Sequence, residues 1–194
     1  RASENMKAIE RFVRTESARR EKDLRQKLAS DGARLGRIVY TRTGMHTVES
    51  WEDGHDAKLL KKRRSELRHQ RLELEKRHKL AQEVQKHISD GNGLDGAENV
   101  LQDDLDGMEA QESVRRHLDI LKQKELDLAE EEKALHIETG IHIRSLKLVS
   151  SEDCSRFKSK EKLHDRYVPL SLLGKGGFSE VWKAYDLSEL REVA

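Results

Sequence analysis

An apolar side chain recurs at every seventh position through residues 60–88, and this period constrains the possible folds strongly. The residues concerned are Leu60, Leu67, Leu74, Ala81 and Ile88. A period of seven places them on one stripe of a long helix, at one of the two core positions of a coiled coil. The companion core positions, three residues earlier, are Ala57, Arg64, Arg71, His78 and Gln85. Because most companions are polar, we expect an association that is specific but weak for each heptad.

A second stripe with the same period lies within a helix expected from about residue 97 to residue 139. It consists of Val114, Leu121, Leu128 and Leu135, and its companion positions include Glu125 and Glu132. The glycine-rich linker 89–96 separates the two helices. The helices can fold back on each other or pair between chains, and the sequence leaves both arrangements open. We predict a homodimer formed through the nine stripe residues, with a chance stripe on a single amphipathic helix as the alternative.

The composition also favours long helices over a single packed globule. Charged residues make up 39% of the chain, hydrophobic residues 35% and aromatic residues 4%, whereas an ordinary soluble domain has about 25% charged and nearly half apolar residues. With so little apolar surface, the chain can offset the conformational entropy lost on ordering only where a narrow apolar stripe is buried against a partner. The 38 basic residues nearly balance the 37 acidic ones, so no direct nucleic-acid binding is predicted.

Compartment and metal binding are constrained by a few residues. No apolar stretch approaches the roughly 20 residues that cross a bilayer, so no membrane association is expected. Cys154 is the only cysteine, so an internal disulfide is excluded and a reducing compartment fits best. His69, His78 and His87 recur every nine residues, which is not the spacing of a metal site on one helix face, and no metal ligands are predicted.

Turn-forming residues divide the chain into segments. The predicted segments are a charged helix at 1–33, a β-hairpin at 34–54, a coiled-coil region at 55–149, a linker at 150–165 and the start of a further domain at 166–194. The first helix is expected to end at Ser30–Gly32, and the last long helix to break at Gly140, because glycine favours helix termination. After that break, residues 141–148 are expected to form either a helical continuation or a lead-in to the next segment. Two β-branched and aromatic runs around Arg42–Gly44 predict the hairpin, which should pack against a helix or a second copy because a hairpin alone is marginal.

A glycine-rich loop lies near the C-terminal end, between two apolar runs. Its sequence is Gly174-Lys175-Gly176-Gly177-Phe178-Ser179-Glu180-Val181, which matches the kinase pattern G-x-G-x-x-G-x-V except for serine at the third glycine. Glycine permits the backbone to approach phosphates with no Cβ in the way. A dinucleotide-binding loop has similar glycines but precedes a helix, whereas a β-prone run follows here. The pattern therefore predicts a strand–loop–strand element that covers ATP phosphates, in preference to a bare turn.

The chain resembles the Tousled-like serine/threonine protein kinases. The residues that carry the resemblance are Glu152–Phe157, Leu163–Tyr167 and Leu172–Leu187, with a second match at Arg34–Ile38 and Trp51–Gly54. Ser179 at the third glycine position is usual in that family. The resemblance implies a mainly α chain with long coiled-coil helices and a short β-hairpin, followed by the first β-strands of a truncated kinase N-lobe.

The resemblance also implies an activity and a set of contacts. The complete protein would be a nuclear kinase that uses ATP and Mg²⁺, dimerises, and phosphorylates histone chaperones during chromatin assembly. Leu173 and Val181 would pack on the adenine ring, and Gly174, Gly176 and Ser179 would cover the phosphates. The full set of expected ATP-binding residues is Leu173, Gly174, Lys175, Gly176, Gly177, Phe178, Ser179 and Val181.

Catalytic residues are not expected within these 194 residues. The family's V-A-x-K strand begins at Val193-Ala194, so its lysine and the catalytic and metal-binding aspartates would follow, and the fragment alone is expected to be inactive. Without partner strands, residues 166–194 are expected to be poorly ordered. The basic run Lys61–Arg64 fits either a nuclear-import signal or a solvated helix face. The alternative function is a non-catalytic coiled-coil dimerisation or scaffold module.

Overall fold

The computed structural model describes the backbone of residues 2–90 and 97–194, and the side chains of residues 4–80, 82–83, 86 and 111–194. Most of the linker predicted at 89–96, and the side chains of Ala81 and Ile88, lie outside this part. The chain divides into two compact units, one of residues 1–55 and 136–194 and the other of residues 56–135.

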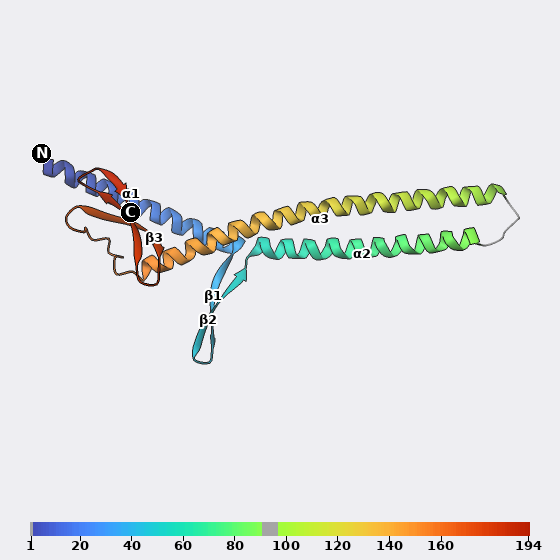
Figure 1. Cartoon of the computed structure of the whole chain (residues 1–194), viewed down its shortest axis with the longest axis horizontal. Coiled ribbons are helices and arrows are strands. Elements are labelled where there is room, and N and C mark those ends of the chain that lie inside the picture. Colours follow the sequence, from blue (N-terminus) through green and yellow to red (C-terminus); the bar gives the residue numbers. More distant parts are fainter. Residues whose placement is uncertain (1, 91–96) are drawn as a thin grey trace. The chain divides into compact units, whose positions relative to one another are not determined.

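Three long helices, a two-stranded hairpin and a three-stranded antiparallel sheet confirm the mainly α fold class. The elements in chain order are α1 (Ala2–Leu35), β1 (Gly36–Thr43), β2 (His46–Asp53), α2 (His55–Asp90), α3 (Ala97–Asp153), β3 (Tyr167–Lys175), β4 (Glu180–Asp186) and β5 (Arg191–Val193) (Figure 1). No helix in the described part of the chain is long and apolar enough to cross a membrane.

Within residues 56–135, α2 and the first part of α3 pair in an antiparallel manner. Arg63 contacts Glu131 at 2.7 Å, and Arg71 contacts Glu125 at 2.9 Å. The partner numbers fall along α3 as they rise along α2, which defines the antiparallel direction. The chain itself therefore adopts the fold-back arrangement that the sequence left open.

The predicted stripe residues contribute to this pairing to different extents. Leu60, Leu121 and Leu128 are buried, at 9%, 6% and 4% exposure. Leu67 is half-buried, and it lines one recess of the helix pair together with Leu128. The remaining described stripe residues are also half-buried, and they are Leu74, Val114 and Leu135. Their role in forming a dimer stays a prediction.

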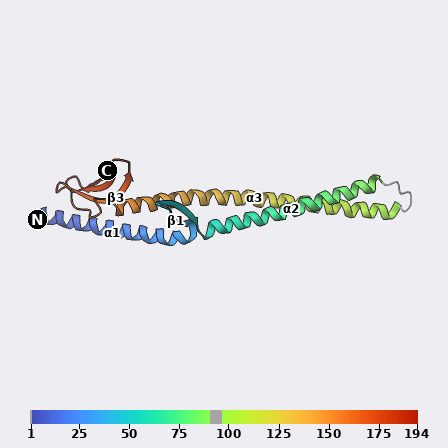
Figure 2. The ribbon, with the colours of Figure 1, turned by 90° about the horizontal axis from the view of Figure 1, so that it is seen from below.

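In the other unit, α1 lies antiparallel to the C-terminal part of α3 (Figure 2). Arg25 of α1 donates both terminal guanidinium N–H groups to Asp153, at 2.7 and 3.0 Å. Arg34 forms an ion pair with Glu138 further along. These contacts join segments more than a hundred residues apart in the sequence.

Helix α1 does not end at Ser30–Gly32, and that prediction is wrong. The helix continues through Gly32 to Leu35, which is 1% exposed. Gly36 then takes a φ of +132°, and a Cβ there would lie 2.4 Å from the Glu52 carbonyl oxygen. The helix therefore ends where only glycine fits between it and the hairpin, rather than at the first glycine.

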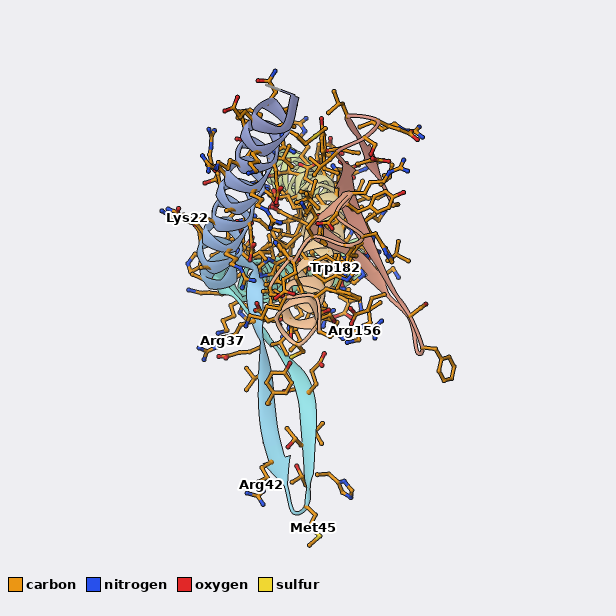
Figure 3. All side chains as sticks on the ribbon, turned by 90° about the vertical axis from the view of Figure 1, so that its left-hand side faces the viewer. Lys22, Arg37, Arg42, Met45, Arg156 and Trp182 are labelled. Carbon is orange, nitrogen blue, oxygen red and sulfur yellow. The ribbon has the colours of Figure 1, made fainter. Side chains whose placement is uncertain are left out.

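The predicted hairpin is present, with strands β1 and β2 in continuous register from Gly36–Asp53 to Thr43–His46. Trp51 near its base packs edge-on against His142 of α3, with ring centroids 6.1 Å apart. Glu49 pairs with Lys147 of α3 at 2.7 Å. The far end, where Figure 3 labels Arg42 and Met45, is exposed. The hairpin therefore packs on a helix along part of its length, as expected.

The helix break predicted at Gly140 is also wrong, because α3 continues through it to Asp153. Of the two alternatives for residues 141–148, the structure shows the helical continuation. A glycine inside a helix costs only about 1 kcal/mol relative to alanine. Contacts on both sides of Gly140, with Arg34 through Glu138 and with Trp51 through His142, offset that cost.

Residues 167–193 form an antiparallel sheet of order β3–β4–β5 that packs on α1. Val168, Leu170 and Leu187 are buried, with Ile9 and Val13 of α1 packed against them. Our expectation of poor order for residues 166–194 is thus not met in this structure. We did not foresee that α1 supplies apolar surface to this three-stranded sheet.

Candidate nucleotide-binding loop

The loop between β3 and β4 is closed at its neck by the paired residues Lys175 and Glu180. Inside it, the Gly176 amide donates a hydrogen bond to the Ser179 carbonyl oxygen at 2.8 Å. A Cβ added at Gly174 or Gly177 would meet no atom within 4 Å. The backbone at these positions is therefore open to an approaching ligand. The element is strand–loop–strand, so the dinucleotide-binding alternative, which requires a helix after the loop, does not apply.

All eight predicted ATP-binding residues lie together at this end of the β3–β4 hairpin. Leu173 and Val181 are each 49% exposed, and the Phe178 ring is fully exposed. Leu173 falls at a β-bulge between the register pairs of Leu172 and Gly174, which leaves it out of the regular alternation of faces. The structure thus brings the residues together, and their contacts with a nucleotide stay a prediction.

Strand alternation identifies the face of the sheet that Val181 occupies. Side chains two apart on a strand share a face, so Val181 lies with Lys183 and Tyr185. Lys183 and Tyr185 line a recess of about 340 Å³ against α1, opposite Phe12 and Leu24. Helix α1 therefore covers part of the face that carries Val181.

The opposite face is formed around Trp182, which Figure 3 labels near Arg156. Trp182 and Ala184 line a separate recess together with Phe157. The Phe157 and Trp182 rings meet edge-on, with centroids 6.2 Å apart. The segment between α3 and β3 thus packs on the face that points away from α1.

Glu180 is the most highly connected side chain at the loop neck, and our sequence analysis missed it. Its carboxylate accepts hydrogen bonds from the Ser155 hydroxyl at 2.5 Å and from the Trp182 indole N–H at 3.2 Å. It also pairs with Lys175 at 3.1 Å. The hydrogen bond from Ser155, followed by those from Trp182 and Lys175, lowers the pKa of Glu180 to about 2. The opposite charges of Lys175 and Glu180 flanking the loop were a usable signal, whereas Ser155 lies too far away in sequence.

A second carboxylate fixes β3 just before the loop. The Leu172 amide donates to Glu152 Oε2 at 3.3 Å. Lys160 pairs with Glu152 at 2.9 Å and with Glu21 of α1 at 2.7 Å. The amide that lies beside the bulge is thus bound by a side chain from the end of α3.

A third carboxylate, Asp186, holds the far end of β4. Its side chain is nearly buried, and Arg166 binds it at 2.5 Å. The Ser188 and Glu189 amides also donate to Asp186, at 2.8 and 3.2 Å. These hydrogen bonds, with the Arg166 contribution first, lower the pKa of Asp186 to about 2.

The described residues contain no group of three or more histidine, cysteine, aspartate or glutamate side chains that could hold a metal ion. Neither an H-R-D-x-x-x-x-N catalytic loop nor a D-F-G motif occurs in these 194 residues.

Comparison with known proteins identifies the relatives of the chain. It is 33% identical to the serine/threonine-protein kinase TOUSLED of Arabidopsis thaliana over 188 residues, which cover 97% of this chain and 27% of that protein. It is 32% identical to human serine/threonine-protein kinase tousled-like 1 over 194 residues, covering 88% of this chain and 25% of the relative. Over 100 residues it is 44% identical to human tousled-like 2.

The chain is homologous to a segment of the Tousled-like kinases. It spans about a quarter of the length of the first two relatives named above. No protein-family model matches it, and no solved structure matches it significantly. The relationship to Tousled-like kinases extends over almost the whole chain, helices included, and not only over the glycine-rich loop.

Proposed function

We propose that the complete protein is a serine/threonine protein kinase of the Tousled-like type, and that this chain contributes the phosphate-covering hairpin of its ATP site. The observation that carries the proposal is the β3–loop–β4 hairpin in a chain whose relatives are named as such kinases. In kinases, a loop of this pattern covers the phosphates of ATP while Mg²⁺ ions neutralise the developing charge. Residues outside these 194 would hold the metal.

The eight loop residues have distinct roles in this proposal. Backbone amides around Gly174, Gly176 and Ser179 cover the phosphates. Leu173 and Val181 pack on the adenine ring, and their exposure is consistent with a surface that awaits a ligand. Lys175 fixes the neck of the loop through Glu180.

A phosphotransfer assay on the complete protein tests this proposal. We expect it to transfer phosphate from Mg²⁺-ATP to serine or threonine of a protein substrate. Substituting Gly176→Val places a branched side chain within contact distance of Ser179, whose oxygen atoms lie 3.6–3.7 Å from a Cβ at that position. We expect this variant to raise the KM for ATP. Absence of phosphotransfer by the wild-type protein under any Mg²⁺-ATP concentration would contradict the proposal.

Substrates and location follow from the family alone. We propose that histone chaperones are substrates and that the protein acts in the nucleus during chromatin assembly, because the resemblance implies both. A phosphorylation assay with purified histone chaperones, with an unrelated acidic protein as the control, tests the first point. Equal phosphorylation of both proteins would contradict it.

A second candidate function is association through the helices. The half-buried and buried leucine stripe of residues 56–135 favours it. We propose that the parent protein forms a homodimer in which the helix pairs associate. Such association would raise the local concentration of one kinase domain near another and favour autophosphorylation between protomers. If the protein is strictly monomeric at about 10–100 µM, the dimer proposal is contradicted and the kinase proposal is unaffected.

A further inference from the structure

The segment Glu152–Lys160, which we call the tether, connects the end of α3 to the sheet that carries the loop. It contacts the β3–β4 hairpin at three points along the two strands. Glu152 binds the Leu172 amide, Ser155 binds Glu180, and Phe157 packs on Trp182. A passive connection needs none of these contacts, so their convergence near the loop calls for a physical explanation.

The contact between Ser155 and Glu180 is the most specific of the three. Ser155 is 8% exposed, and its hydroxyl oxygen accepts a hydrogen bond from the Phe157 amide at 3.1 Å. That acceptor role orients the hydroxyl so that its proton points to Glu180 Oε2, 2.5 Å away. A hydrogen bond to an ionised carboxylate is short and about twice as strong as a neutral one.

Glu180 transmits this contact to the loop itself. Its other carboxylate oxygen, Oε1, pairs with Lys175 across the neck. The neck residues precede Gly176 and follow Ser179 directly, so their positions set the two ends of the glycine-rich loop. Glycine-rich backbone loses much conformational freedom when it is fixed on a ligand. Holding both ends before ATP arrives reduces that loss, which is how preorganisation raises affinity.

We propose that Ser155 and Glu180 are positioning residues for ATP, which orient the glycine-rich loop by joining its neck to the tether. The inference rests on the proposed function of the loop, and it assigns a share of the nucleotide affinity to Ser155 of the tether and to Glu180 at the loop neck. Neither residue touches the nucleotide. They act through Lys175 and the loop backbone.

The direct test compares Ser155→Ala with Ser155→Thr and Ser159→Ala in the complete protein. Threonine retains the hydroxyl, and Ser159 is an exposed serine of the same segment. We expect Ser155→Ala to raise the KM for ATP by about three- to tenfold, because only part of the free energy of this hydrogen bond contributes to orienting the loop for ATP. We expect kcat to change by less than about twofold, because the contact exists before the transition state. Threonine should restore most of the affinity, and Ser159→Ala should match the wild type.

Amide hydrogen exchange without nucleotide provides a readout that does not require activity. We expect residues 176–179 to exchange faster in Ser155→Ala, and not in Ser159→Ala. The double variant Ser155→Ala/Glu180→Ala should exchange and bind ATP much as Glu180→Ala does, because both changes remove the same contact. Glu180→Gln keeps a hydrogen-bond acceptor and serves if the alanine variant unfolds.

The outcomes separate the two claims. If the wild-type protein binds ATP, while Ser155→Ala equals Ser159→Ala in exchange and in KM, the positioning role is overturned and the kinase function stands. If Ser155→Ala and Glu180→Ala have fully additive effects, the coupling through this contact is likewise overturned. If the wild-type protein binds no ATP, both claims fail.

Discussion

At the scale of single residues, glycines at different positions have different structural roles. Gly36 has a φ of +132°, and a Cβ atom added there would lie 2.4 Å from the Glu52 carbonyl oxygen. Gly140 lies inside a helix with nothing within 4 Å of a would-be Cβ. Only the first position requires glycine, and it is the one that joins α1 to the hairpin.

Substituting alanine at these two positions should give opposite results. Gly36→Ala combines a disfavoured φ with a backbone clash, and we expect a loss of at least about 2 kcal/mol in the free energy of unfolding. Gly140→Ala improves helix propensity, and we expect a gain of up to about 1 kcal/mol. Urea denaturation followed by circular dichroism measures both. Equal effects of the two substitutions would contradict the assigned roles.

Two carboxylates hold the sheet by their charge. The pKa of Asp186 is lowered from 3.8 to about 2, chiefly by Arg166, and that of Glu180 from 4.5 to about 2, chiefly by Ser155. A carboxylate with a lowered pKa in the folded state stabilises the fold above its unfolded pKa. That contribution is lost as pH falls from about 4.5 to about 2.

Asp186→Asn should therefore reveal a pH-dependent difference from the wild type. At about pH 6 we expect the variant to melt at a lower temperature, because Arg166 loses its ionised partner. The gap should shrink as pH falls toward 2, where the wild-type carboxylate is about half protonated, and should close below that pH. Asp119→Asn, at an exposed position of α3, provides the control and should show no such gap. A gap for Asp186→Asn that stays constant with pH would exclude the charge-based account.

At the scale of elements, the helix pair is specified by charge as well as by leucines. Arg64 and Arg71, companion core positions of α2, contact Glu132 and Glu125 of α3. These companion positions, which reduce the apolar surface of each stripe, therefore carry positive charge on α2 and negative charge on α3. An α2–α3 antiparallel pair brings them together, whereas pairing α2 with a parallel second copy would place arginines opposite each other.

A charge swap tests this specificity. Arg71→Glu alone should lower the urea midpoint by placing like charges together, and Arg71→Glu/Glu125→Arg should restore most of the loss. Arg77→Glu, at an exposed position of α2, is the matched control. If the double variant were no better than the single one, the pairing of these two positions would be refuted.

The apolar stripe should contribute more than the charges. Leu128 is 4% exposed, and Leu128→Ala should cost about 2–5 kcal/mol. Leu126 is 54% exposed on the same helix, and Leu126→Ala should cost less than about 0.5 kcal/mol. Chemical denaturation distinguishes these values readily, and similar losses at both positions would count against the observed helix orientation.

Elements with local signals were predictable from the sequence, and long-range contacts were not. The seven-residue stripes predicted α2 and α3, and the β-branched and aromatic runs around Arg42–Gly44 predicted the hairpin. The strand–loop–strand at residues 174–181 followed from its glycines and β-prone flanks. The helix ends at Gly32 and Gly140 were wrong, because glycine propensity is worth little against tertiary packing.

The candidate site likewise combines residues that local sequence predicts with contacts that it does not. Its loop residues are contiguous in sequence, so their pattern was sufficient to find them. The partner of Glu180 is Ser155, 25 residues earlier, and Lys160 reaches Glu21, 139 residues away. No periodicity connects such positions. Only the folded chain shows that α1 and the tether support the sheet.

At the scale of the whole molecule, the leucine stripes raise the question of oligomeric state. Part of the stripe is already buried by the pairing of α2 with α3 inside one chain. A dimer would then need the half-buried positions Leu67, Leu74, Val114 and Leu135. Contact through these positions would leave the fold-back pair intact.

Light scattering on the 194-residue chain measures this association. We expect a dimer at tens of micromolar, about 10–100 µM, that dissociates on dilution because each heptad contributes little. Replacing Leu67 and Leu74 with glutamine should weaken it, while replacing the exposed Leu80 should not. In the complete protein, the variant that no longer dimerises should lose the proposed autophosphorylation. Full retention of autophosphorylation would contradict a role for dimerisation in it.

Binding of a fluorescent ATP analogue to the complete protein, with Mg²⁺ present, tests the central claim most directly. The account predicts saturable binding that unlabelled ATP competes away and that Gly176→Val weakens, with Gly140→Ala as a glycine variant that leaves it unchanged. The absence of competable binding, or equal binding by the wild type and Gly176→Val, would contradict the claim that this hairpin covers the phosphates of a nucleotide.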